Sequence, residues 1–222
     1  MVYYIYNNKR KGNKMKIMEI GSTKGGTGVT TVACALAVIA GQQGSQVLLV
    51  DLADNADTTK WLATHQSLQL ATPSAGSFLS VIENDNVTIW RPWASARKRL
   101  SANLPEGEWD VVIIDAGTTG QHDYTLNNKI VVPERVLCVT NEYMCLSNVV
   151  NATRPDRAIC FFDENRSLTF GDIQSVLACP ELVKMPLDYA LSRAIDAGMA
   201  TNRKNLYEGW AKELLSPVTV YK

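Results

Sequence analysis

The residues from Met18 to Thr31, MEIGSTKGGTGVTT, have the types and spacing of a loop that binds phosphate. A mostly apolar run ends at Gly21, a glycine-rich turn follows, and Thr30–Ala40 is long and apolar enough to be a buried helix. Glycines let the backbone curl so that several N–H groups point inward, and the positive end of the helix adds to the field there. We therefore predict an anion site at this turn. Its candidate cofactor-binding residues are Gly25, Gly26, Thr27, Gly28, Val29, Thr30 and Thr31.

One part of the usual phosphate loop is replaced in this chain. The usual pattern ends G-K-[ST], with a lysine that reaches the outer phosphates, and here Val29 occupies the lysine position. Thr30 and Thr31 keep the hydroxyl groups that would face a magnesium ion. A charged hydrogen bond contributes about 1.5–3 kcal/mol, so we expect its loss to weaken nucleotide binding by one to two orders of magnitude, roughly.

Two apolar runs end in a carboxylate. Gln46–Asp51 and Val111–Asp115 both have the pattern of a buried strand followed by aspartate. Ligands of parallel sheets gather at the carboxyl ends of the strands, so both aspartates should lie beside the phosphate loop. Carboxylates and hydroxyls are ligands that suit magnesium. Thr30 and Asp115 are therefore candidate metal ligands.

KGGTGVTT resembles the deviant Walker A motif, K-G-G-x-G-K-[ST]-T, of the MinD/ParA family of ATPases. The resemblance implies that the cofactors are ATP or ADP and Mg²⁺, and that Lys24 reaches the phosphates of a partner chain in a homodimer. The family also has V-D-x-D after its second strand. The resemblance makes the first of these aspartates, Asp51, a third candidate metal ligand. Ala53 occupies the second position, and Asp54 is the next carboxylate along the chain. Lys24 and Asp54 are the catalytic candidates, and hydrolysis is expected to be slow or absent.

Later segments resemble the same family in the same order. Arg135–Asn141 resembles the strand that ends in V-T-P-E, with Asn141 in place of the proline. Residues 163–166 occupy the place of the loop that reads the adenine base, where Asp163 and Asn165 are both candidates. Pro186 and Asp188, in MPLDYALSRAIDAG, match a family segment whose backbone flanks the base. Asp163, Pro186 and Asp188 therefore complete the predicted nucleotide site.

Alternating strands and helices predict an α/β fold, a P-loop NTPase-like, mostly parallel sheet flanked by helices on both faces. We assign residues 15–222 to a single MinD/ParA-like nucleotide-binding domain and residues 1–14 to a basic N-terminal arm that is a candidate for disorder. Further elements are expected between the strands at Gln46–Asp51 and Val111–Asp115: a helix beginning within Thr58–Ala63, a loop over Gln66–Gly76, a short helix and an edge strand within Phe78–Trp90, and a helix over Ser95–Leu104. A terminal helix is expected over Asn202–Leu215, with four residues on one face: Leu206, Tyr207, Trp210 and Leu214.

Composition bounds the class of protein. The 222 residues carry a formal net charge of +0, so a nucleic-acid contact would need a local patch. Such a patch could come from basic residues near tryptophans: Trp90, Arg91, Trp93, Arg97, Lys98 and Arg99. Tryptophan in a small α/β domain is more often part of the packing, however, and a run of charges is usually a solvated face. No apolar run approaches the length of a membrane span, which favours a cytoplasmic protein and argues against a membrane partner. The five cysteines lack C-x-x-C spacing and predict free thiols, and His65 and His122 are too far apart to suggest a metal site.

Two main hypotheses of function follow. The first is a switch protein that binds ATP-Mg, forms a homodimer and acts in positioning or partitioning, through a protein adaptor or a DNA-binding partner, with non-specific DNA as a further possible ligand. The TadZ/CpaE-like and BcsQ-like relatives that lack the loop lysine, and plasmid-stability proteins of the StbB type, are the subgroups it resembles. The second is a pseudo-ATPase scaffold that binds partners without turnover. A true ATPase that uses Asp54 or another carboxylate is a third alternative.

Overall fold

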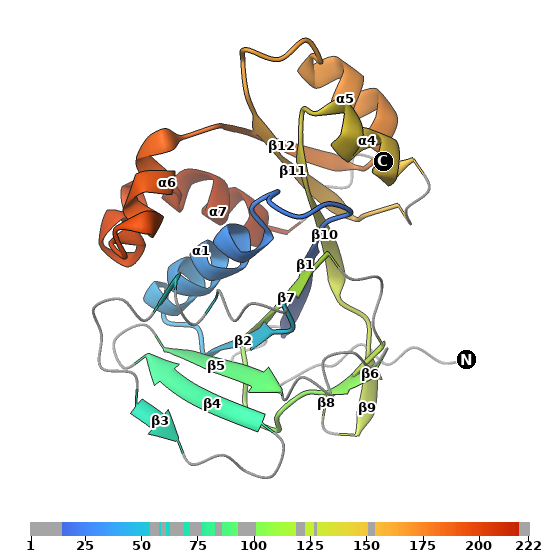
Figure 1. Ribbon diagram of the computed structural model, residues 1–222. Coiled ribbons are helices and arrows are strands. Elements are labelled where there is room, and N and C mark those ends of the chain that lie inside the picture. Colours follow the sequence, from blue (N-terminus) through green and yellow to red (C-terminus); the bar gives the residue numbers. More distant parts are fainter. Residues whose placement is uncertain are drawn as a thin grey trace.

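A mostly parallel sheet of nine strands forms the centre of the computed structural model (Figure 1). The strand order is β12-β11-β10-β1-β7-β2-β5-β4-β3, and the neighbours from β12 to β5 are parallel while β4 and β3 are antiparallel. The strands are β1 (Lys16–Gly21), β2 (Val47–Asp51), β3 (Gln69–Ala71), β4 (Ser77–Ile82), β5 (Val87–Pro92), β7 (Val111–Gly117), β10 (Glu134–Thr140), β11 (Arg157–Phe162) and β12 (Glu181–Pro186). The predicted fold class is confirmed.

The structure describes residues 15–53, 58, 61–62, 69–71, 77–82, 86–92, 101–118, 123–126, 128–150 and 154–217. Within them, no helix is long and apolar enough to cross a membrane. All five cysteines are free, as predicted, and only Cys179 is not fully buried.

One face of the sheet is covered by α1 (Val29–Gln42), α6 (Tyr189–Asp196), the 3-10 helix η1 (Ala200–Leu206) and α7 (Glu208–Leu215) (Figure 1). Helix α1 is buried along most of its length because it packs between the sheet and α7. Alternate strand residues, among them Ile20 and Leu49, contribute to this core. The predicted terminal helix is divided at Tyr207, whose φ of −134° is not helical. Tyr207 and Leu214 are nevertheless buried in this core, with Leu206 and Trp210 packed against it, as the sequence predicts.

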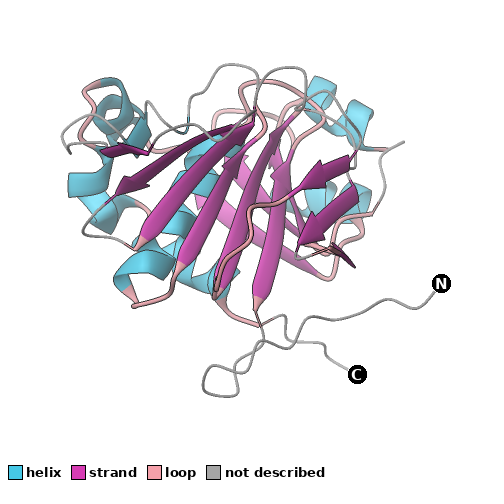
Figure 2. Cartoon of the chain, turned by 90° about the horizontal axis from the view of Figure 1, so that it is seen from below, coloured by secondary structure: helices cyan, strands magenta, loops and turns pink. Residues whose placement is uncertain are grey.

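The opposite face is covered in two parts (Figures 1 and 2). Helices α4 (Tyr143–Val149) and α5 (Phe170–Leu177) pack on β10 and β11 through a core that includes Val139, Cys160 and Ile173. A small second sheet, β6 (Ser101–Asn103), β8 (Asp123–Leu126) and β9 (Lys129–Val131), carries side chains such as Tyr124 onto the β2 and β7 side. Helices thus flank both faces, but over half of one face a sheet takes their place.

Three local predictions are wrong. The helix expected over Ser95–Leu104 is contradicted at β6, where residues 101–103 pair with β8 as a strand. The loop expected over Gln66–Gly76 contains β3, and the short helix expected within Phe78–Trp90 is replaced by β4. In each case the backbone pairs with a neighbouring strand, and such pairing depends on context more than on local propensity.

The carboxyl end of α7 is bonded to the amino-terminal ends of β1 and β11, which lie opposite the phosphate loop. Arg157, 1% exposed, donates hydrogen bonds to the carbonyl oxygens of Leu214 and Ser216 and pairs with Glu181 at 2.5 Å. Lys16 Nζ donates to the Leu214 carbonyl at 3.1 Å. Cations at the carboxyl end of a helix satisfy carbonyl groups that have no partner within the helix. The pKa of Lys16 is lowered, mainly by its burial.

Candidate functional site

The phosphate loop connects β1 to α1 and has the backbone conformation that the glycine pattern predicts. Gly26 and Gly28 have φ angles of +78° and +84°, a region in which side chains are strained. A Cβ at Gly28 would also lie 2.7 Å from the Phe161 ring, so a larger residue does not fit there. The loop closes on itself because the Thr27 hydroxyl donates to the Lys24 carbonyl at 3.1 Å.

The loop lines a cavity of about 550 Å³. Every predicted loop residue, 25–31, faces this cavity together with Lys24, Leu52, Ala53 and residues 116–118. Val29 begins α1 and is 7% exposed, so an apolar side chain stands where the usual loop has an ammonium group. The cavity therefore offers backbone N–H groups and threonine hydroxyls, with Lys24 as the one lysine or arginine among its described lining residues.

Thr30 and Asp115 meet beneath this cavity. The Thr30 hydroxyl donates to Asp115 Oδ2 at 2.7 Å, and the Gly117 N–H donates to Asp115 Oδ1 at 3.1 Å. A hydroxyl and a carboxylate beside a phosphate cavity fit magnesium, which binds proteins through one or two oxygen ligands and completes its shell with phosphate and water. In the part of the chain that the structure describes, no group of three or more His, Cys, Asp or Glu residues could hold a metal. Thr30 and Asp115 are thus suited to a metal that arrives with a nucleotide.

Asp51 lies beside Asp115 in the strand register but has different partners. Its carboxylate is 0% exposed, pairs with Arg91 of β5 at 2.5 Å and accepts a hydrogen bond from the Thr58 hydroxyl. Asp51 Oδ1 has no hydrogen-bond partner among the described residues. Neither Asp51 nor Asp115 is among the described residues that line the phosphate cavity, although the residue after each of them, Leu52 or Ala116, does line it. Asp51, the third candidate metal ligand, therefore lies next to the site but is already paired with the guanidinium of Arg91.

Arg91 is a residue whose role the sequence did not indicate. The sequence grouped it with Trp90 in a basic surface patch, but its side chain is 14% exposed and paired with Asp51, and Trp90 is 8% exposed. A basic surface patch is therefore not formed by these two residues, and the burial of Trp90 in a core agrees with the packing role that the sequence also indicated. The position of Arg91, at the end of a strand that pairs with β2, is the only signal that could have indicated the pair.

Lys24 is held by Glu142, which lies two residues after the end of β10 and directly before α4. Lys24 Nζ donates a hydrogen bond to Glu142 Oε2, and Arg166 pairs with Glu142 Oε1 at 2.8 Å. The hydrogen bond from Lys24 lowers the pKa of Glu142. The sequence offered Glu142 only as part of a family segment, without a partner.

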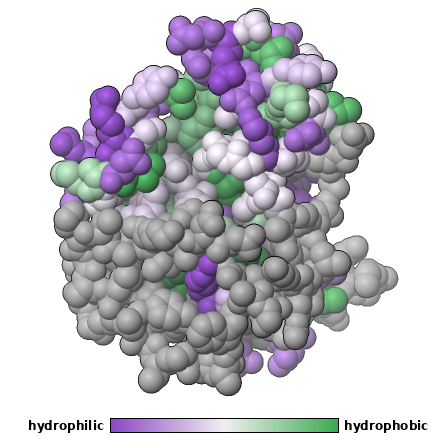
Figure 3. All heavy atoms as spheres, viewed as in Figure 1, coloured by the Kyte–Doolittle hydropathy of each residue, from purple (hydrophilic) through white to green (hydrophobic). Residues whose placement is uncertain are grey.

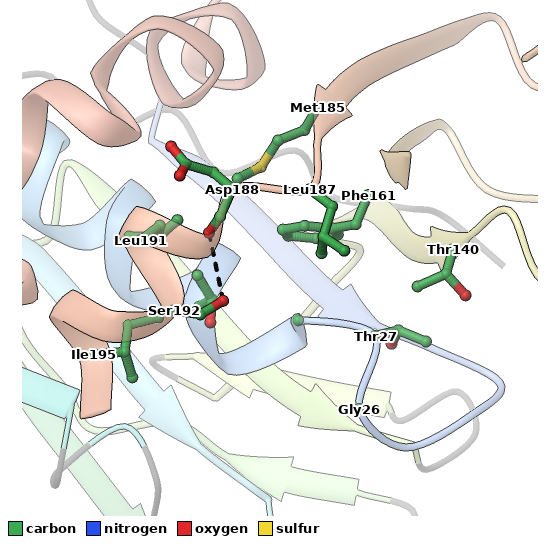
Figure 4. Close-up of a pocket in the computed structure, with 12 residues that line it drawn as sticks. Gly26, Thr27, Thr140, Phe161, Met185, Leu187, Asp188, Leu191, Ser192 and Ile195 are labelled. Carbon is green, nitrogen blue, oxygen red and sulfur yellow. Dashed lines mark hydrogen bonds between the residues drawn. The ribbon is translucent and has the colours of Figure 1, made fainter. Parts of the chain in front are cut away.

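A second cavity, of about 210 Å³, adjoins the phosphate loop and shares Gly26, Thr27, Gly28 and Thr31 with the first (Figure 4). Phe161, Met185 and Leu187 form an apolar wall at the ends of β11 and β12, and α6 forms the other side. Asp188 lines this cavity and caps α6 by accepting a hydrogen bond from the Ala190 N–H at 2.7 Å. An apolar cavity that continues from a phosphate loop suits a nucleotide base.

The loop at residues 163–166 is held beside this second cavity. Asn141 Nδ2 donates to the Asp163 carbonyl at 2.8 Å, and the Asp163 N–H donates back to Asn141 Oδ1 at 2.9 Å. The Asp163 carboxylate accepts from the Asn165 N–H and side chain, which lowers its pKa. Among the described residues, Asp163 and Pro186 are not in the cavity lining, so the structure brings Asp188 to the cavity and leaves these two next to it.

Several sequence predictions fall outside the described residues. They concern the basic arm at 1–14, the second catalytic candidate Asp54, both histidines, and the basic patch at Trp93 and residues 97–99. Asp54 follows Ala53, which does line the phosphate cavity. In the helix expected near Thr58, Thr58, Trp61 and Leu62 are helical.

Comparison with known proteins supports the resemblance drawn from the sequence. Residues 15–91 match the AAA_31 family, described as an AAA domain. The chain is similar in structure to a ParA family ATPase from Chlorobium tepidum TLS, with a TM-score of 0.64 and 14% identity over 91% of this chain and 98% of the other. It is also similar to the septum site-determining protein MinD from Pyrococcus horikoshii OT3 in complex with Mg-ADP (TM-score 0.61, 20% identity, 89% and 92% of the two chains).

A third similar structure is a nucleotide-binding protein from Archaeoglobus fulgidus in complex with ADP, with a TM-score of 0.57 and 15% identity over 93% of this chain and 94% of the other. No curated protein sequence matches the chain significantly. The structural neighbours are thus ParA/MinD-family ATPases matched over most of the chain at low identity, and they show that this chain has their fold.

Proposed function

We propose that this protein is a ParA/MinD-like nucleotide-dependent switch that binds ATP-Mg and hydrolyses it slowly or not at all. The observation that supports this best is the Thr30–Asp115 pair at 2.7 Å, at the foot of an open phosphate cavity that continues into an apolar one. Two of the similar structures, the Pyrococcus MinD and the Archaeoglobus protein, hold Mg-ADP and ADP respectively.

In this proposal each part of the site has one task. The N–H groups of the loop and the start of α1 bind the phosphates, and Thr30 and Asp115 hold magnesium, which would neutralise charge between the outer phosphates. The apolar wall at Phe161 and Leu187 binds the base, and Asp188 fixes the start of α6 beside it.

Slow turnover follows from what the cavity lacks. Val29 supplies no charge to the outer phosphates, and Ala53 cannot orient a water molecule. Positioning of the attacking water and stabilisation of the transferred phosphoryl group carry most of the rate enhancement in enzymes of this class. Binding without rapid hydrolysis suits a switch whose state is set by nucleotide occupancy.

The proposal includes a homodimer and a position-giving partner. Large hydrophobic side chains at the start of α4 and around α6 are exposed: Tyr143 by 74%, Met144 by 62% and Tyr189 by 63%. Figure 3 shows hydrophobic residues between hydrophilic ones over the upper part of the molecule, where α4 and α5 lie. Exposed apolar residues near a site favour contact with another chain. We propose that a second copy of this protein binds at these exposed residues. We also propose that the dimer acts in the cytoplasm, in positioning or partitioning, and that it does so together with a protein adaptor or a DNA-binding partner.

Calorimetry with Mg-ATP, combined with light scattering in the presence of a non-hydrolysable analogue, tests this function. We expect binding at cellular ATP concentrations together with a shift from monomer to dimer. Absence of binding at millimolar nucleotide would contradict the proposal.

The alternative is a pseudo-ATPase scaffold that uses the fold only to bind partners. Its support is that Lys24 and Asp51 both already have protein partners, Glu142 and Arg91. This alternative predicts that a Gly28→Asp variant, whose side chain would fill the loop, still binds its partners fully.

A further inference from the structure

The Glu142 carboxylate lies between two cations that belong to different loops of the candidate site. Its Oε2 accepts from Lys24 of the phosphate loop, and its Oε1 pairs with Arg166 of the loop after β11 at 2.8 Å. Arg166 lies 3.5 Å from the Asp163 carboxylate as well. A single carboxylate therefore connects the phosphate loop to the loop beside the apolar cavity.

The backbone holds this carboxylate in place. The preceding residue, Asn141, is 1% exposed and bonded to the Asp163 backbone in both directions. The Glu142 carbonyl accepts from the N–H groups of Cys145 and Leu146, at 3.0 and 3.1 Å, in the first turn of α4. These hydrogen bonds fix the backbone on both sides of Glu142, so its side chain begins at a defined position beside Lys24.

Lys24 supplies the positive charge in the described lining of the phosphate cavity. Val29 leaves the usual lysine position without charge, and Lys24 is the one lysine or arginine among the described residues that line the cavity. Like a phosphate group, the Glu142 carboxylate is negatively charged and has oxygen acceptors, and it binds the Lys24 ammonium group that a phosphate would bind.

We propose that Glu142 is an internal competitor for the nucleotide phosphates, which must displace it from Lys24. The inference rests on the proposed function and adds the residue that regulates the affinity of the same site. Both partners are partly exposed, with side-chain exposures of 40% for Lys24 and 25% for Glu142, so the pair is weak enough for an anion to break. Arg166 keeps Glu142 paired after Lys24 leaves, which makes the release easier.

Mg-ATP calorimetry of the full chain tests the competition. We expect Glu142→Gln to bind Mg-ATP about three- to fivefold more tightly than the wild type, the range of a partly exposed ion pair. Glutamine keeps the size of the side chain and an acceptor for Arg166. In a Lys24→Ala background the same substitution should change nothing, because the lysine that it releases is gone. Glu208→Gln, which removes an exposed pair with Lys212 on α7, is the matched control and should bind like the wild type.

A second measurement needs no nucleotide. Acetylation of lysines by acetic anhydride, followed by mass spectrometry, should modify Lys24 at least about twofold faster in Glu142→Gln than in the wild type, since an unpaired amine reacts more freely. The exposed Lys204 provides the internal reference. Equal labelling of Lys24 in both proteins would overturn the proposal, as would a gain in affinity that persists without Lys24. If no variant binds Mg-ATP but the labelling rises, the hold of Glu142 on Lys24 stands and the proposed nucleotide function fails.

Discussion

Asp51 and Asp115 end neighbouring strands in the same register, yet they belong to different environments. Asp115 receives the hydroxyl of Thr30 from the phosphate loop and lies under the cavity. Asp51 accepts a hydrogen bond from the hydroxyl of Thr58 and pairs with the guanidinium of Arg91. Both carboxylates are fully buried, so burial does not distinguish them. The partner distinguishes them: Asp115 is joined to a hydroxyl of the phosphate loop, where we propose that it helps to hold magnesium, whereas Asp51 is paired with the cation of Arg91.

The comparison shows what a sequence pattern can predict about a site. An apolar run that ends in aspartate predicts that the carboxylate lies at the carboxyl end of a parallel strand, and this holds for both residues. It does not predict what the carboxylate meets there, because the partner comes from another strand or helix.

The largest expected effect concerns the Arg91 side of the comparison. Replacing Arg91 by Met leaves the Asp51 carboxylate buried without its cation, and removal of one partner of a buried pair costs about 3–5 kcal/mol. Urea unfolding should show this loss in the free energy of unfolding. Arg203→Met, at an exposed position, is the control and should leave stability nearly unchanged. A loss below about 1 kcal/mol for Arg91→Met would mean that the buried Asp51 carboxylate does not depend on Arg91.

The next effect concerns the cavity on the Asp115 side. Val29→Lys restores an ammonium group to the phosphate cavity and should tighten Mg-ATP binding about ten- to a hundredfold, as expected for a charged hydrogen bond. Calorimetry measures the change. Val29→Met, which has a long side chain without charge, separates the effect of charge from that of size. Equal affinities for the two variants would show that the cavity does not hold phosphate.

A pair of matched substitutions sharpens the comparison directly. Asp115→Asn should reduce the gain in ATP affinity on adding magnesium by about tenfold, because the ion loses a charged ligand. Asp51→Asn should leave that gain unchanged while lowering the free energy of unfolding, since Arg91 loses its partner. Titrations with and without EDTA give both ratios. A larger loss in Asp51→Asn than in Asp115→Asn would reverse the assignment.

The smallest expected effect concerns pH and Lys24. Lys24 lowers the pKa of Glu142 below its usual value of 4.5, so the pair stabilises the folded state above that pH and loses its contribution as the pH falls through the lowered value. Lys24→Met should therefore be less stable than the wild type by a few tenths of a kcal/mol, roughly, at pH 7, and the difference should vanish in acid. Chemical unfolding at pH 7 and near pH 3 measures it, and a difference that grows in acid would contradict the ion pair.

Strands and the phosphate loop could be predicted because their signals are local. The apolar runs at β2 and β7 and the glycines at 25, 26 and 28 determine their own conformation. The Lys24–Glu142 pair joins residues 118 positions apart, and the Arg91–Asp51 pair joins two strands, so neither leaves a local pattern. The small sheet of β6, β8 and β9 was missed for the same reason, since its short strands are stabilised by pairing and by packing on β2 and β7.

The central claim, that the cavity above Asp115 binds a magnesium nucleotide, is tested most directly by measuring the Kd of ATP for the wild-type protein with and without magnesium. We predict binding in the millimolar range or tighter, at least about tenfold stronger with magnesium, as a metal held by Thr30 and Asp115 requires. Equal affinity with and without magnesium, or no binding in either case, would contradict the claim.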